Sequence, residues 1–432
     1  MSRFTLHRGD SREVLKTLAE NSVDSIVTDP PYELGFMGKS WDNTGIANDV
    51  TLWREALRVL KPGGYLVAFG GTRTFHRLAC AIEDAGFEMR DTGLRGHMPQ
   101  AEDCPWLMAW AYGSGFPKSL DVSKAIVMGQ ITAPATADAR QWEGWGTALK
   151  PAWEPIVMAR KPLIGTVAAN VLRHGTGALN IDACRIQTGE AIPVFSSSGG
   201  RKFEQSHTQP ARKSQQVGTQ DVGRWPANLI HDGSPEVVAC FPDAPGQLAP
   251  VKYSGDERKT QGVYGAMKGG HRPGGLSASE NGYPVPNGPQ YIDSGSAARF
   301  FYCAKASRED RNEGCEHMAS KPLLWSSGTQ NPGSFQAEGT DRSSQNFHPT
   351  VKPTELMRWL VRLVTPAGGT VVDPFMGSGS TGKAAMLEGM RFIGIDRDAD
   401  EHGNPLGYID IARARIEFAL RQGHQPNLLE AA

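Results

Sequence analysis

The spacing of apolar residues over the first 162 positions predicts alternating strands and helices. SREVLKTLAE (11–20) places its apolar residues on one helical face, and VDSIVT (23–28) is typical of a buried strand. This order predicts βαβ architecture with a largely parallel sheet. Strands are expected at 4–10, 23–28, 65–70, 106–113 and 155–162, and helices at 11–20, 52–60 and 75–82.

The same alternation returns after position 346. Few residues follow Asp396, so a nucleotide-binding domain that opened at Thr370 would lack most of its strands. The missing strands are those of the N-terminal part, which predicts one seven-stranded, Rossmann-like α/β sheet assembled from both chain ends. Helices are expected at 355–364, 383–389 and about 407–421, and strands at 370–375 and 391–396.

Between the two ends, Gly, Ser, Pro, Asn and Gln dominate and helical periodicity is lost. We therefore expect a region inserted into the sheet domain, irregular and partly mobile, above all at 196–223 and 255–295. Positions 201–224 hold five basic and two acidic residues, a local positive excess that suits either a solvated loop or a DNA contact. The expected parts are 1–165, 166–345 and 346–432.

Composition narrows the class of protein. The 432 residues are 39% hydrophobic and 21% charged, as in a globular protein, and the net charge of −1 gives no global positive field. The six cysteines form no C-x-x-C pair, which argues against a zinc knuckle and a secreted disulfide framework. Without a signal peptide or a long apolar run, the expected location is the cytoplasm, and no metal site is expected.

A glycine-rich loop, TVVDPFMGSGSTGKAAM (370–386), fits three nucleotide-binding patterns. Gly377, Gly379 and Gly382 spell the dinucleotide pattern G-x-G-x-x-G. The run from Gly377 to Lys383 resembles a P-loop, but Ala384 lacks the hydroxyl that binds Mg²⁺. The third candidate is an S-adenosylmethionine loop. On this interpretation Lys383 is a solvated residue in the first helical turn.

Local charge favours the third pattern. Asp373, at the end of the expected strand, and Asp396 and Asp398 after the next strand would repel a polyphosphate. S-adenosylmethionine carries an ammonium and a sulfonium group, which carboxylates attract.

A second candidate site is DPPY (29–32), which follows the buried strand at 23–28. Asp29 can accept a hydrogen bond from an exocyclic amine, and the carbonyl of Pro30 is a second acceptor. Tyr32 offers an aromatic face on which a flipped base can stack. A turn of structural role only is the alternative explanation for this tetrapeptide.

The chain resembles the DNA amino-methyltransferases, in particular the β class, in which DPPY precedes the cofactor loop. The resemblance covers RGDSREVLKTLAENSVDSIVTDPPY, ALRVLKPGGYLVAFG, HPTVKPTELMRWLVRLVTPAGGTVVDPFMGSGSTG and FIGID. Two departures are Ser380, where the family often has Thr, and Asp396, where Glu is commoner. The resemblance implies that the target base is held by Asp29, Pro30, Pro31 and Tyr32, and the cofactor by Asp10, His348, Thr350, Lys352, Asp373, Phe375, Gly377, Ser378, Gly379 and Asp396.

The expected function is methylation of N6 of adenine in double-stranded DNA, with S-adenosylmethionine as cofactor and the base flipped out. DPPY rather than SPPY favours adenine over N4 of cytosine, which is the alternative. The region 166–345 would then recognise the target. A P-loop ATPase, a catalytically silent DNA-binding module and a methyltransferase acting on RNA or protein are more distant alternatives. A homodimer and a cognate restriction enzyme are candidate partners, and Asp10 is equally suited to cap the helix that follows it.

Overall fold

The structure is a computed structural model of the whole chain. It describes residues 3–35, 42–89, 107–113, 115, 120–126, 136–187, 192–196, 215–220, 223–243, 295–304, 308–322, 343–399 and 402–422.

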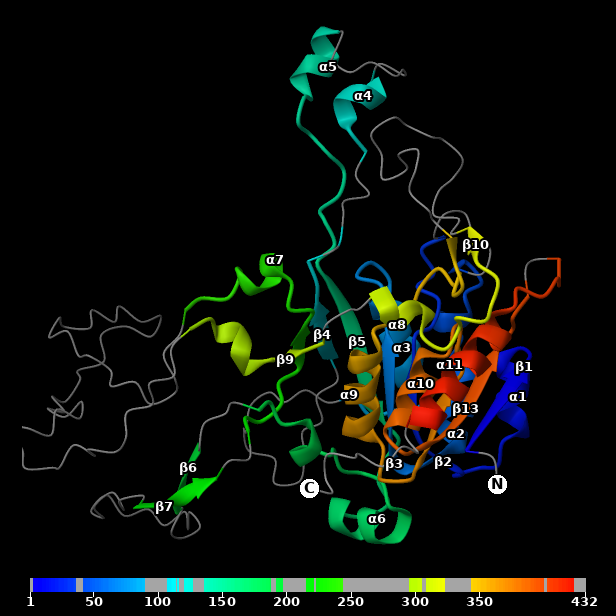
Figure 1. Cartoon of the computed structure of the whole chain (residues 1–432), viewed down its shortest axis with the longest axis vertical. Helices are drawn as coiled ribbons and strands as arrows, with labels where there is room; N and C mark the ends of the chain where they lie inside the picture. Colours follow the sequence, from blue (N-terminus) through cyan, green and yellow to red (C-terminus); the bar gives the residue numbers. More distant parts are fainter. Residues whose placement is uncertain are drawn as a thin grey trace, which may run out of the picture. The chain divides into compact units, whose positions relative to one another are not determined.

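One large sheet forms the frame of the protein, and strands from the two chain ends lie side by side in it (Figure 1). Its order is β1-β13-β12-β2-β3-β5-β4-β8-β9, and β5 runs antiparallel to both of its neighbours. The strands are β1 (Phe4–Arg8), β2 (Val23–Thr28), β3 (Leu60–Phe69), β4 (Leu107–Ala111), β5 (Trp153–Arg160), β8 (Leu229–His231), β9 (Tyr302–Cys303), β12 (Thr370–Asp373) and β13 (Arg391–Asp396).

Seven of these strands, β1 to β5 with β12 and β13, come from the two chain ends, which confirms the predicted Rossmann-like sheet. The structure adds two strands to the prediction. β8 pairs parallel with β4, and β9 pairs with β8, so the region between the two ends extends the sheet by two strands. Both strands are two or three residues long, too short for periodicity to reveal.

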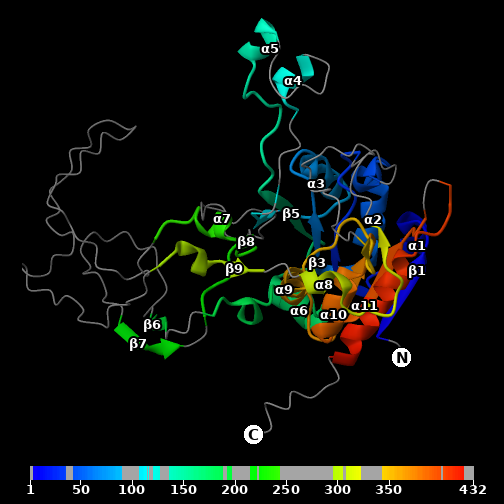
Figure 2. The same ribbon diagram turned by 45° about the horizontal axis from the view of Figure 1, so that its top comes forward.

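Helices cover both faces of the sheet, as expected for strands that are buried on each side. α1 (Ser11–Thr17), α2 (Val50–Val59) and α3 (Phe75–Asp84) share one core with Ile26, Leu66 and Val372. α9 (Thr354–Val364), α10 (Ser380–Leu387) and α11 (Tyr408–Gln422) share the other core with Val27 and Val371 (Figure 2). Successive strand residues thus enter opposite cores, which is the period of a strand.

The central strands β2 and β12 are the point where the chain diverges to the two faces. They pair parallel, and β2 leads to α2 on one face whereas β12 leads to α10 on the other. The loops after these strands therefore separate at the carboxyl edge of the sheet and leave a crevice, where ligands bind in open α/β sheets.

The remaining elements lie between β2 and α9 in the sequence. β6 pairs antiparallel with β7, and β10 with β11, each pair forming a small separate sheet. The full set of these remaining elements is η3 (Ile46–Asn48), α4 (Val122–Ile126), α5 (Ala137–Gln141), α6 (Val167–His174), η4 (Asp182–Cys184), β6 (Ile192–Ser196), β7 (Gln215–Gln220), α7 (Pro235–Val238), η5 (Ala297–Phe300), α8 (Arg308–Asn312), β10 (Lys321–Pro322) and β11 (Ser343–Ser344).

The contacts between residues divide the chain into two compact units. One is Val238–Arg299, and the other combines Met1–Val237 with Phe300–Ala432. Most of the two segments expected to be mobile, 196–223 and 255–295, lies outside the described residues, as does most of the basic cluster at 201–224. Within the described part of the chain, no helix has the length and apolar content to cross a membrane.

Candidate active site

A cavity of about 1180 Å³ opens where the loops after β2 and β12 separate. Its wall is built from DPPY, the glycine loop, the segment His348 to Lys352, the end of β13 and the start of β5. That volume is above the roughly 300–1,000 Å³ of most small-molecule pockets, so there is space for more than one ligand group.

Asp373 ends β12 and joins three elements through its carboxylate. Oδ1 accepts from Thr28 Oγ1 (2.6 Å) and from the backbone N–H of Phe375 (3.0 Å), and Oδ2 accepts from Thr381 Oγ1 (2.6 Å). Burial raises the pKa of Asp373 to about 7, although these hydrogen bonds oppose the shift. Asp373 therefore ties β2 to β12 and to the first turn of α10 at the floor of the cavity.

The glycine loop turns sharply where it lines the cavity. Gly377 has φ +49°, and a Cβ there would lie 2.7 Å from Nε2 of His348, so only glycine fits this position. Burial lowers the pKa of His348 to about 4, so its ring is neutral at pH 7. The ring packs edge-on against Tyr408, with centroids 4.5 Å apart.

Two carboxylates shape the end of β13. Asp396 accepts from the backbone N–H of Gly377 (2.8 Å) and of Asp398 (2.6 Å), which leaves lone pairs on both oxygens for a ligand. Asp398 pairs with Arg8 (2.8 Å) and accepts from the N–H of Tyr408 (2.6 Å). Asp398 thus fixes the loop, and Asp396 faces the cavity.

The loop after β2 is held by its own carboxylates. Asp42 accepts from the backbone N–H groups of Glu33 and Leu34, and Glu33 accepts from those of Gly45 and Ala47. These contacts hold the segment that carries DPPY on a folded support.

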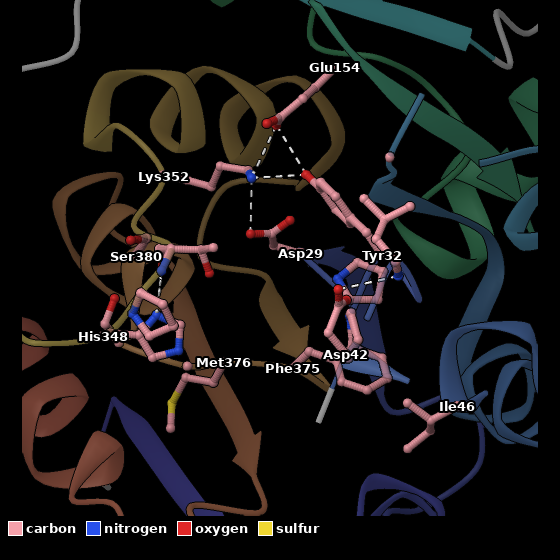
Figure 3. A pocket seen from close by; sticks show the side chains of 18 of the residues that line it. Asp29, Tyr32, Asp42, Ile46, Glu154, His348, Lys352, Phe375, Met376 and Ser380 are labelled. Carbon is pink, nitrogen blue, oxygen red and sulfur yellow. Dashed lines mark hydrogen bonds and ion pairs between the residues drawn. The ribbon is translucent and has the colours of Figure 1, made fainter. Parts of the chain in front are cut away.

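Lys352, Tyr32, Asp29 and Glu154 meet at one end of the cavity (Figure 3). Nζ of Lys352 lies 3.0 Å from Oδ2 of Asp29, 3.1 Å from Oε2 of Glu154 and 3.0 Å from the Tyr32 hydroxyl, which in turn donates to Oε2 of Glu154 (3.0 Å). Burial alone would lower the pKa of Lys352, but the two carboxylates raise it above the ordinary value. Lys352 is therefore a buried cation between two carboxylates.

Asp29 differs from the other cavity carboxylates in one respect. Its Oδ1 is buried and has no hydrogen-bond partner among the described residues, whereas Oδ2 is held by Lys352. A buried acceptor without a partner costs about 1–3 kcal/mol, so this oxygen favours a ligand that donates a hydrogen bond.

All of the residues predicted for the site line the cavity except Gly379, which has φ +77° and packs against Ala412. Asp10 lines the cavity and also caps α1, where it accepts from the N–H of Arg12. Lys352 has no free N–H, so a direct hydrogen bond to the cofactor, which the resemblance implies that Lys352 helps to hold, would need one of its three partners to leave.

The prediction that Lys383 is solvated is wrong. Its side chain is 1% exposed, and Nζ pairs with Asp310 (2.7 Å) and Glu313 (2.6 Å) in and after α8. Because this ammonium is buried away from the cavity lining, the loop lacks the phosphate-binding lysine of a P-loop as well as its hydroxyl.

Sequence reasoning missed Glu154 and Arg415. Glu154 precedes an apolar run, PIVMA, and a carboxylate at the start of such a strand was the available signal. Arg415 on α11 is fully buried and donates to the carbonyl of Ser378 (2.8 Å) and to the hydroxyl of Ser380 (3.1 Å). It supports the glycine loop from behind, and nothing in the helical pattern marks it.

Comparisons with known proteins agree on one family. A family model described as DNA methylase, covering the N6 and N4 enzymes, matches residues 23–402. Type II methyltransferase M2.DpnII of Streptococcus pneumoniae is 43% identical over 70 residues, 16% of this chain and 24% of that protein. M.HindIII of Haemophilus influenzae is 26% identical over 220 residues, 40% of this chain and 64% of that protein. The chain thus spans less than two thirds of either relative.

Solved structures of similar proteins include M1.HpyAVI in complex with S-adenosylmethionine, at 14% identity and a TM-score of 0.36, covering 96% of this chain and 98% of that one. Another is the cytosine-N4-specific PvuII DNA methyltransferase, at 13% identity and a TM-score of 0.39, covering 96% and 94%.

Proposed function

Since this chain belongs to the N6/N4 DNA methylase family, we propose that it transfers a methyl group from S-adenosylmethionine to the exocyclic N6 of a flipped adenine in double-stranded DNA. The observation that carries this proposal is the buried Oδ1 of Asp29, which has no partner among the described residues and lies in a cavity large enough for a cofactor and a base.

The glycine-loop half of the cavity fits the cofactor. Asp396 keeps lone pairs for ribose hydroxyls. A cationic ligand suits Asp10 and Asp373 better than a phosphate, because a cation stabilises the ionised form of the buried Asp373. Phe375 and His348 add flat, uncharged surfaces to the same wall. When bound there, S-adenosylmethionine supplies an electrophilic methyl group on a positively charged sulfur.

The DPPY half fits the base. Oδ1 of Asp29 accepts one amino hydrogen and the carbonyl of Pro30 accepts the other, which directs the nitrogen lone pair toward the glycine-loop half. The hydroxyl of Tyr32 is hydrogen-bonded to Glu154 and Lys352, which fixes the ring. The ring then offers a face on which the base can stack. Catalysis then comes mainly from alignment of the two reacting groups.

The choice of adenine rests on DPPY, where an aspartate stands in place of serine. The division of labour along the chain is also a proposal: 1–165 hold the base, 346–432 hold the cofactor, and 166–345 recognise the target sequence. β8 and β9 would then anchor this recognition region in the catalytic sheet.

The test is single-turnover transfer of labelled methyl groups to duplex DNA, with the modified nucleoside identified by mass spectrometry. We expect 6-methyladenine from the wild-type protein, and a rate at least about 100-fold lower for Asp29→Ala with cofactor affinity unchanged. An Asp29→Ala protein with the wild-type rate would refute the role of Asp29. If 4-methylcytosine were the only product, the base assignment would be wrong and the reaction type right.

A further inference from the structure

We propose that Glu154 and Lys352 form a positioning pair that acts through Asp29. The pair holds one oxygen of Asp29 so that the other is presented to the amino group of the base. This inference rests on the proposed function and adds a residue, Glu154, that neither DPPY nor the glycine loop contains.

The hydrogen-bond capacity of Lys352 is fully used in this cluster. An ammonium has three N–H donors, and Nζ of Lys352 lies 3.0 to 3.1 Å from three acceptors: Oδ2 of Asp29, Oε2 of Glu154 and the Tyr32 hydroxyl. No donor is left for the base, so Lys352 orients Asp29 and does not itself read the substrate.

Loss of Glu154 would change how Lys352 contacts Asp29. Lys352 is 8% exposed, and Asp29 would then be its single carboxylate partner among the residues that the structure describes. An ammonium attracted to one carboxylate can bridge both oxygens, and Oδ1 would then be occupied. Glu154 and the Tyr32 hydroxyl hold Nζ on the Oδ2 side, as Figure 3 shows.

Charge also links Glu154 to Asp29. The cluster contains two carboxylates and one ammonium, so Lys352 is shared between Glu154 and Asp29 and neutralises Asp29 only in part, which keeps Oδ1 of Asp29 a strong acceptor. Glu154→Gln would make the cluster neutral while its amide oxygen could still accept from Lys352. The effect of this change should therefore fall on the chemical rate more than on either binding step.

The position of Glu154 is set by strand direction. β5 runs antiparallel to β3, so the first residues of β5 lie at the edge where β3 ends, and this edge faces the cavity.

At the other end of β5, Arg160 pairs with Glu88 (2.9 Å), outside the cavity lining. Glu88→Gln is therefore a matched control, because it neutralises a carboxylate paired with the same strand.

The experiment compares wild type, Glu154→Gln, Glu88→Gln, Asp29→Ala and the double variant Asp29→Ala/Glu154→Gln in single-turnover methylation, with DNA and cofactor affinities measured separately. We expect Glu154→Gln to lower the rate about 10- to 100-fold, with both affinities within about twofold. Glu88→Gln should keep the wild-type rate. In the Asp29→Ala background, Glu154→Gln should have no further effect, because its route through Asp29 is already removed.

An unchanged rate for Glu154→Gln would overturn the inference, and so would rate losses that multiply in the double variant. A loss of affinity equal to the loss of rate would also contradict it, since that outcome indicates a structural role. If the wild-type protein methylates no DNA while binding cofactor, the proposed function fails instead, and the two failures are thereby distinguished.

Discussion

The carboxylates of the cavity are of two kinds, which differ in whether each oxygen accepts a hydrogen bond. Both oxygens of Asp373 accept hydrogen bonds from threonine hydroxyls or a backbone N–H, and those of Asp396 accept from backbone N–H groups. Asp29 alone among these three keeps a buried oxygen without a partner in the described part of the chain. The same residue type thus serves as a structural tie in one place and as a free acceptor in another.

Asp373 should make the stability of the fold depend on pH. Its pKa is raised to about 7 by burial, so the fold favours the protonated acid, and this contribution is complete below about pH 4 and disappears as the pH rises through 7. A rise of the pKa from its ordinary value of 3.8 to about 7 corresponds to about 4 kcal/mol. Asp373→Asn cannot ionise and should not show this pH dependence.

The measurement is the free energy of unfolding in urea for wild type and Asp373→Asn between pH 4 and 8. The difference between the two proteins should move in favour of the variant as the pH rises. Parallel curves over this range would mean that the carboxylate stays ionised in the fold.

At the scale of elements, α10 is fixed from three sides by buried contacts. Lys383 reaches Asp310 and Glu313, and Asp310 also accepts from the N–H and the hydroxyl of Thr354 at the start of α9. Gly382 lies so close to α11 and β13 that an added Cβ would be 2.6 Å from Cε1 of Phe392. The glycine loop is therefore positioned by packing behind it as well as by its own turn.

We expect Lys383→Met to destabilise the protein by about 3–5 kcal/mol, because Asp310 would keep a buried charge without its ammonium partner. Lys16→Met is the control, since Lys16 pairs with Glu13 on the exposed surface of α1 and this change should leave the melting temperature near that of wild type. Equal melting temperatures for Lys383→Met and wild type would show that the buried pair contributes nothing to stability.

At the scale of the whole molecule, the sheet joins the two chain ends and uses only β8 and β9 from the described part of the region between them. The hairpin β6–β7 forms a sheet of its own. We therefore expect deletion of 199–220 to leave cofactor binding intact and to weaken DNA binding, measured by titration at several salt concentrations.

A second variant of full length separates charge from chain length in that test. Replacing Arg201, Lys202, Arg212 and Lys213 with Gln should lower the slope of log affinity against log salt by about 0.9 for each DNA phosphate that is no longer neutralised. Unchanged affinity and slope in both variants would assign the segment to a passive loop.

Periodicity predicted the strands of both ends and the helices that pack on them, because each is long enough to show its period. It did not predict α4 and α5, which have five residues each. It could not predict the direction of β5, because an apolar run reads the same in a parallel and an antiparallel strand. Glu154 was missed because parallel strands carry site residues at their carboxyl ends, whereas Glu154 lies at the start of an antiparallel strand. Lys383 was misjudged because its ion-pair partners, Asp310 and Glu313, lie 73 and 70 positions away in a region without periodicity.

The pairing of β1 with β13 determines when the sheet can be completed during synthesis on the ribosome. The ion pair between Arg8 and Asp398 spans 390 positions, and at about 5–20 residues per second the first strand waits tens of seconds for its partner. During that time β2 lacks its neighbour β12, so the DPPY loop has no glycine loop facing it. A nascent or prematurely terminated chain that ends before β12 therefore has no cofactor cavity.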